Sequence, residues 1–203
     1  ALYMLLPHPN AESVITLGSR LTADEEYKKA AAPFRSLPPT DPPYVRRESS
    51  LMLAFDGVPT VQVPVPTTTA SRVFEMRTYE SHNERAHRAK VRMFTDLGEV
   101  DIFRKVGLTP VFFARTVVGP RMPSLVYMLV FEDMNAREAS WARFGENPEW
   151  RALASTPGYT NAEIVSKIHQ AGLGPAEEDD AGNPAVNQKP CESAAHATRS
   201  TEN

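Results

Sequence analysis

Between residues 72 and 172 the spacing of hydrophobic residues changes several times, and the order of these changes is compatible with few folds. Residues 72–79 (Arg-Val-Phe-Glu-Met-Arg-Thr-Tyr) alternate with the period of two that is typical of a half-buried strand. From Asn83 to Val106 apolar residues recur every three or four positions, which predicts one long helix ending before Gly107. Because glycine disfavours a helix interior, Gly98 favours a break near that position.

Three more strands and two short helices are predicted after this helix. Residues 110–118 and 125–131 are β-branched and aromatic runs joined by a short Gly-Pro-containing connection, which predicts a hairpin. The run 125–131 is too apolar for one face to be exposed, so it predicts a central strand. Residues 135–144 and 148–154 predict short helices, and residues 162–169 a closing strand. The order is β-α-β-β-α-β, the ferredoxin-like arrangement of an α+β protein.

The start of the chain repeats the second half of this module. Residues 2–6 (Leu-Tyr-Met-Leu-Leu) match residues 126–130 (Val-Tyr-Met-Leu-Val), and an Asn-Ala pair follows in both places. After one gap, Asp24-Glu-Glu-Tyr27 matches Asn147-Pro-Glu-Trp150, and residues 48–54 stand where a closing strand is expected. A tandem repeat is therefore predicted, with one complete copy preceded by the second half of another. On this interpretation the first copy is truncated at its start, and the chain is a piece of a longer protein.

Four regions follow from these patterns. Residues 1–57 form the half module, and residues 72–172 form the complete one. Residues 58–71 carry several prolines and threonines, which disfavour helix and predict an extended linker. Residues 173–203 are rich in Glu, Asp, Asn, Ala and Ser with little to bury, so we expect a disordered tail.

Composition excludes several classes of function. The net charge is -3 and the basic residues are scattered, which argues against a nucleic-acid partner. No apolar run is long enough for a transmembrane segment. The single cysteine, Cys191, lies in the polar tail and has no partner for a disulfide or a zinc site. The sequence has no Gly-rich phosphate loop, nucleophile elbow or Cys/His cluster, so we expect neither a cofactor nor a metal.

The complete module resembles the NIPSNAP family. The resemblance rests on Phe74-Glu-Met-Arg-Thr-Tyr79, a long helix, Gly107-Leu108, a strand hairpin and Asn147-Pro-Glu-Trp150. It covers residues 72–170 well and residues 1–57 in part, since Glu25 and Tyr27 replace the proline and tryptophan of the last motif. The resemblance implies a module of the dimeric α/β barrel type, in which two sheets face one another through self-association or through pairing of repeats within one chain.

Function is open between two hypotheses. The family has no generally accepted reaction, so the first hypothesis is a non-catalytic module that binds a small polar or aromatic ligand or takes part in assembly. The alternative is a cofactor-independent enzyme, similar to monooxygenases or isomerases, that uses the barrel cleft. The fold by itself supports neither.

The candidate site lies on the first strand of the complete module. Phe74, Met76 and Thr78 should point one way, toward the helices, and Glu75, Arg77 and Tyr79 the other way, into a cleft. A carboxylate, a guanidinium and a phenol together could bind a polar ligand or orient a proton. The competing interpretation is structural, with Arg77 paired to a carboxylate, because buried charges need partners even without a ligand.

Other candidates are weaker. His82 could be an acid or base at the cleft mouth, but His82 and His87 are more simply surface residues at a helix start. Trp141 and Trp150 could form a stacking wall for an aromatic ligand, although core packing explains them as well. Loop and strand-end roles explain His8 and His169 more simply than catalysis or haem ligation.

Overall fold

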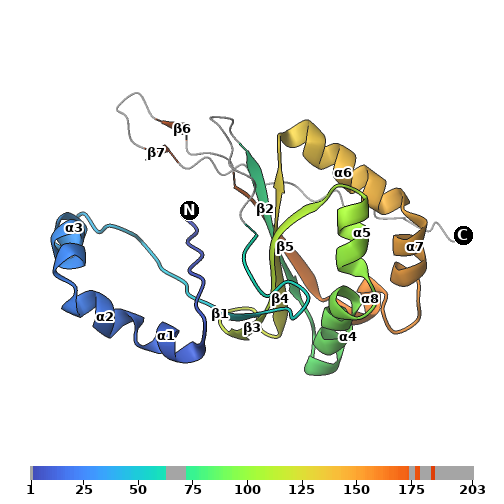
Figure 1. Cartoon of the computed structure of the whole chain (residues 1–203), viewed down its shortest axis with the longest axis horizontal. Helices are drawn as coiled ribbons and strands as arrows, with labels where there is room; N and C mark the ends of the chain where they lie inside the picture. The colour runs from blue at the N-terminus through green and yellow to red at the C-terminus, as the bar shows by residue number, and fades with distance from the viewer. Residues whose placement is uncertain (1, 63–71, 174–176, 179–183, 186–203) are drawn as a thin grey trace, which may run out of the picture. The chain divides into compact units, whose positions relative to one another are not determined.

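The computed structural model describes residues 2–62, 72–173, 177–178 and 184–185 (Figure 1). These fall into two compact units, one of residues Tyr3–Ser49 and one that begins at Ser50. Residues 63–71 of the predicted linker and most of the predicted tail lie outside the described residues. Within the described ranges, no helix has both the length and the apolar character needed to cross a bilayer.

The first unit consists of three helices: α1 (Ala11–Ile15), α2 (Leu17–Ala23) and α3 (Glu25–Arg35). Asn10 caps α1 and Asp24 caps α3, each by accepting a hydrogen bond from a backbone N–H three residues ahead. None of these helices buries a residue completely. Residues 2–6, which in the repeat match the predicted central strand, do not form a strand: the segment is irregular, and Leu2 and Met4 are exposed. Without a strand to hydrogen-bond to, an apolar run does not become a strand.

The second unit contains the sheet. Its strands are β1 (Leu51–Ala54), β2 (Val73–Glu80), β3 (Thr109–Val118), β4 (Ser124–Phe131) and β5 (Lys167–Leu173), in the spatial order β1-β3-β4-β2-β5. All four neighbouring pairs are antiparallel. The β-α-β-β-α-β order and the central place of β4 are confirmed. The closing strand predicted at residues 162–169 begins only at Lys167, because residues 161–164 form a short helix. β1 falls where a closing strand was expected and extends the β3 edge of the sheet.

Five helices lie on one side of this sheet (Figure 1). They are α4 (Glu84–Thr95), α5 (Glu99–Lys105), α6 (Met134–Glu146), α7 (Pro148–Ala154) and α8 (Asn161–Ile164). The predicted long helix is divided into α4 and α5 at Gly98, whose φ of 84° is a left-handed conformation that glycine adopts without strain. Asn147 caps α7, and Pro148 occupies its first turn.

The residues that cap the helices are equally far apart in the two halves that the repeat matches, α1 to α3 in the first and α6 to α7 in the second. Asn10 and Asp24 are the same fourteen residues apart as Asp133 and Asn147, which cap α6 and α7. This spacing agrees with a tandem repeat, which stays a prediction. In the predicted tail, β6 (Glu177–Glu178) and β7 (Pro184–Ala185) form a minimal antiparallel pair.

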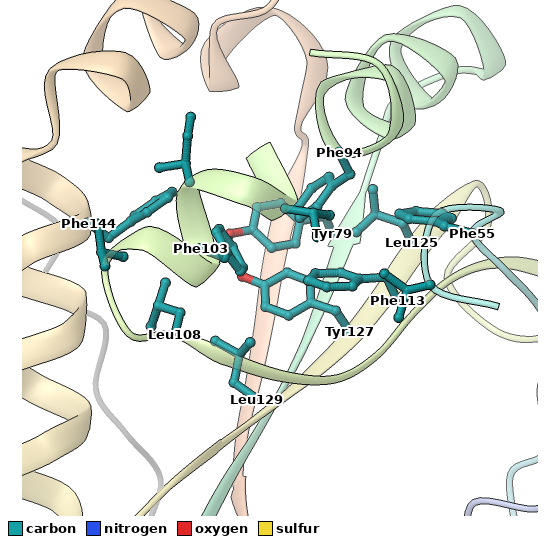
Figure 2. Packing of buried hydrophobic residues seen from close by; sticks show 14 of the residues in the cluster. Phe55, Tyr79, Phe94, Phe103, Leu108, Phe113, Leu125, Tyr127, Leu129 and Phe144 are labelled. Atoms are coloured by element: carbon teal, nitrogen blue, oxygen red, sulfur yellow. The ribbon is translucent and has the colours of Figure 1, made fainter. Parts of the chain in front are cut away.

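The main core fills the space between the sheet and its helices, and it is largely aromatic (Figure 2). The Phe103 ring of α5 meets the Phe144 ring of α6 edge to face, with centroids 4.9 Å apart. The ring centroid of Tyr127 (β4) lies 5.6 Å from the ring centroids of both Phe94 and Phe103. Such pairs contribute about 0.5–1.5 kcal/mol each beyond the burial of their surface. Val58, at the start of the predicted linker, is also buried in this core, so that position is packed against the module.

Candidate functional site

Glu75, Arg77 and Tyr79 lie together on one face of β2, but on the face opposite to the one expected. Glu75 is 0% exposed and Tyr79 belongs to the main core, so this face lies beneath the helices. Phe74 and Met76 belong instead to a second apolar cluster on the other face. The predicted alternation of β2 is confirmed, and the predicted assignment of its faces is wrong. The physical reason is that the charge of Glu75 is paired and the phenol of Tyr79 packs in an aromatic core, so both side chains can be buried.

Glu75 is the centre of a polar network inside the core. Its carboxylate accepts hydrogen bonds from Arg77 Nε, from Arg137 Nε of α6 and, at 3.2 Å, from Trp141 Nε1. Both guanidinium groups also form ion pairs with it. A carboxylate with three donors and two cations around it has little capacity left for a ligand.

Arg77 is held by Glu75 and by an aromatic ring. Its guanidinium stacks 3.7 Å from the Trp141 ring centroid. Burial lowers the pKa of Arg77, but the nearby Tyr127, Tyr79 and Glu75 raise it by more, so the net direction is upward and the group stays charged. It cannot act as an acid or base near neutral pH.

The neighbouring phenols pack against each other. The hydroxyl oxygens of Tyr79 and Tyr127 lie 3.3 Å apart, and their rings stack with centroids 5.7 Å apart. Burial, with a further contribution from Tyr79, raises the pKa of Tyr127 well above its usual range. Figure 2 shows both rings within the aromatic core, between the sheet and the helices. The observed arrangement matches the structural interpretation of this candidate site.

The remaining candidates are distributed over different places. Trp150 packs on Phe144 with ring centroids 4.4 Å apart, which is a core contact. His82 is exposed in the turn before α4 and is not part of the Glu75 network. The expectation that His87 is a surface residue is wrong, since it is buried on the inner side of α4. In the sequence, His87 lies one residue from the apolar stripe of the predicted helix, and this position was the available signal for its burial.

The second apolar cluster covers the sheet face opposite to helices α4–α8. Its members come from strands and from one residue beside them: Val111, Phe112, Ala114, Val126, Val130, Met52, Val61, Phe74, Met76 and Met128. Met76 pairs with Met128 across β2 and β4, and Phe112 pairs with Met128 from β3. These three side chains form an apolar row across the sheet, which we call the methionine row (Phe112, Met76 and Met128).

Toward one end this face becomes polar. His169 of β5 pairs with Thr78, and its Nε2 lies 2.5 Å from Glu80 Oε1. Arg121 approaches the same carboxylate at 3.8 Å. Sequence reasoning did not connect Glu80 with His169. Glu80 and His169 lie on the same face of the sheet as Met76. A correct assignment of the faces, together with the β2–β5 pairing, would have identified the contact.

No metal centre is formed in the part of the chain that the structure describes. There, no three His, Cys, Asp or Glu side chains lie close enough to hold an ion. The His169–Glu80 pair supplies only two such groups.

Comparison with known proteins gives a consistent result. The sequence matches the NIPSNAP family profile over residues 74–177, just over half of the chain. An uncharacterised NIPSNAP-like domain protein from Burkholderia xenovorans is 19% identical, with a TM-score of 0.46 over 56% of this chain and 93% of that one. A NIPSNAP family protein of unknown function from Agrobacterium tumefaciens is also 19% identical, with a TM-score of 0.46 over 56% and 96% of the two chains. No curated protein matches the sequence.

Proposed function

The chain belongs to the NIPSNAP family, and on that premise we propose that it is a non-catalytic module whose sheet pairs face to face with the sheet of a second copy. The pairing would enclose a small polar or aromatic ligand between the two sheets. The observation that carries this proposal is the second apolar cluster, because it lies on the sheet face opposite to the one that α4–α8 cover.

The chemistry of this face suits such a contact. Sheets that pack face to face are about 10 Å apart, and their inner side chains interdigitate. Met76 and Met128 are half-buried within their own unit, so they have surface left to bury. Methionine is flexible and fills irregular gaps, which suits a surface that packs against a copy of itself. The polar end around Glu80 and His169 would border the enclosed space and supply hydrogen bonds to a ligand.

The non-catalytic part of the proposal is supported by the state of the buried polar groups. Glu75 is paired with Arg77 and accepts a hydrogen bond from Trp141, and the Tyr127 phenol stays protonated because burial raises its pKa. An acid–base catalyst needs a group whose pKa lies near the working pH and which can reach a substrate. Arg77 and Tyr127 do not meet the first condition, and Glu75, which is 0% exposed, does not meet the second.

Sedimentation equilibrium of the full chain tests the pairing. We expect the wild type to be dimeric at high micromolar concentration and Met76→Arg to be monomeric, because a guanidinium would be buried without a partner. The matched control is Leu53→Arg, the same kind of change on the opposite face of edge strand β1, where the side chain is 51% exposed. The control should stay dimeric. A monomeric wild type, or equal association of both variants, would refute the proposal.

A second candidate function rests on the His169–Glu80 pair. An imidazole held by a carboxylate is a common general base, and this one lies on the same face as the apolar cluster. It supports an isomerase- or monooxygenase-like reaction without a cofactor, starting with removal of a proton next to a carbonyl group. The test is deuterium exchange at the α-carbon of α-tetralone in D2O, followed by NMR. Faster exchange with the wild type than with His169→Gln would favour catalysis, and equal rates would exclude this role.

A further inference from the structure

On the helical side of the sheet there is a groove that the proposed function does not use. It has a volume of about 500 Å³ and runs along α4, with Arg115 of β3 forming one wall. The volume lies in the range of roughly 300–1,000 Å³ that is typical of small-molecule sites. Arg88 and Arg92, one helical turn apart on α4, line it together with Val91 and His87.

The charge in this groove is not balanced by the described protein groups. Arg92 pairs with Asp96, whose Oδ2 lies 3.4 Å from its Nε. Neither Arg88 nor Arg115 forms an ion pair with any residue in the described ranges. Glu84 is the other carboxylate in the lining, so three arginines face two acids. The lining therefore carries an excess of one positive charge, and the guanidinium groups of Arg88 and Arg115, which form no ion pair within the described ranges, are available to an anion.

His87 is an independent sign that a ligand is expected here. It is 6% exposed, lines the groove, and its Nδ1 is buried with no hydrogen-bond partner among the described residues. Burial lowers the pKa of His87, Glu84 raises it, and Arg115 and Arg88 lower it further. A bound oxyanion would offset the repulsion from the two arginines and allow the ring to become a charged donor.

We propose that this groove binds a small phosphate-bearing molecule, with Arg88 and Arg115 holding the phosphate and the organic part lying along Val91. Arginine suits this role because its planar guanidinium can donate two parallel hydrogen bonds to phosphate oxygens. The groove has room for more than a phosphate ion, which favours a phosphate ester. His87 contributes the third contact. The site is separate from the sheet face and does not depend on pairing with a second copy.

The test is a titration of the full chain, followed through the His87 ring signals by NMR at constant ionic strength. The probes are phenyl phosphate, inorganic phosphate and acetate. We expect both phosphates to move the His87 signals, phenyl phosphate to bind more tightly, and acetate to have no effect. Binding of inorganic phosphate without phenyl phosphate, or an equal response to acetate, would overturn the proposal.

Variants connect the signal with the two arginines. Arg88→Gln/Arg115→Gln should weaken phenyl phosphate binding by about tenfold or more, since two charge-assisted contacts are lost. Arg85→Gln is the matched control, because Arg85 is exposed on the same helix but does not line the groove. All three positions are exposed, so both proteins should fold. Equal affinity of the double variant and the control would refute the assignment.

Discussion

Lys90 and Glu99 form a buried ion pair between α4 and α5, and its removal should be costly. The Nζ of Lys90 lies 3.1 and 3.3 Å from the two carboxylate oxygens, and both side chains are almost fully buried. The ammonium also lies 5.0 Å from the Phe94 ring centroid and 5.1 Å from that of Tyr79. Lys90→Met removes the charge and keeps much of the length of the side chain.

The magnitude follows from the carboxylate that is left behind. Removing one partner of a buried pair costs about 3–5 kcal/mol, because the other charge stays buried without compensation. This is a large part of the roughly 5–15 kcal/mol that stabilises a typical domain. Replacing both partners by apolar groups is often neutral, so Lys90→Met/Glu99→Leu should recover most of the loss.

The free energy of unfolding that Lys90→Met loses should grow as the pH rises. Burial raises the pKa of Glu99, and the charge and hydrogen bond of Lys90 oppose this increase. Because the folded state then holds its proton up to a higher pH than the unfolded state, the free energy of unfolding falls as pH rises between the two pKa values. Without Lys90 the pKa of Glu99 in the folded state rises further, so the pH interval over which stability falls extends to higher pH. Urea unfolding at about pH 5 and about pH 8 should therefore show the smaller deficit at the lower pH.

Lys105→Met is the matched control. Lys105 lies 2.7 Å from Glu149, but both side chains are more than half exposed, so this pair should contribute less than about 1 kcal/mol. Equal destabilisation by Lys90→Met and Lys105→Met would refute the reasoning, as would a deficit that shrinks with rising pH.

Three further changes test other parts of the fold by urea unfolding. Glu75→Ala should cost about 3–5 kcal/mol, because it leaves two guanidinium groups without their carboxylate, and a loss below about 1 kcal/mol would show that the network is unimportant. Gly98→Ala should cost about 1–2 kcal/mol, since φ is 84° there, and a gain in stability would mean that α4 and α5 can join. Asn147→Ala should cost about 1 kcal/mol by removing the cap of α7, and an unchanged unfolding midpoint would argue against that hydrogen bond.

The order of the elements was predictable because each has a clear local cause. The period of two in β2 and the period near 3.6 in α4 and α5 identify them without tertiary information. Gly98 marks the break between those helices for a conformational reason. The apolar run of β4 predicts its central place, since only a strand flanked on both sides is shielded throughout.

The two faces of β2 could not be assigned in the same way, because both carry groups that are able to pack. Hydrophobicity favours Phe74 and Met76 for the core, yet Tyr79 and the paired Glu75 occupy it. The buried carboxylate of Glu75 is compensated by hydrogen bonds from Arg137 and Trp141, which are distant from it in sequence. Local periodicity contains no information about such partners. The shared face of Glu75, Arg77 and Tyr79 was therefore predictable, and so was a structural pairing of Arg77 with a carboxylate, but the burial of this face beneath the helices was not.

The expected strand at residues 2–6 fails for a related reason. Strand formation depends on a hydrogen-bonding neighbour, and sequence similarity to β4 does not supply one. By contrast, the segment around β1 forms a strand because the β3 edge is available to it.

The central claim is that the methionine row is a contact surface between two copies of the chain. It is tested directly by isotope-filtered NMR on a mixture of unlabelled protein and protein with 13C-labelled methionine methyl groups. We expect intermolecular signals from Met76 and Met128 and none from Met93, which is fully buried on α4 next to Ile164 of α8. Intermolecular signals from none of these methyl groups, in a sample shown to be dimeric, would contradict it.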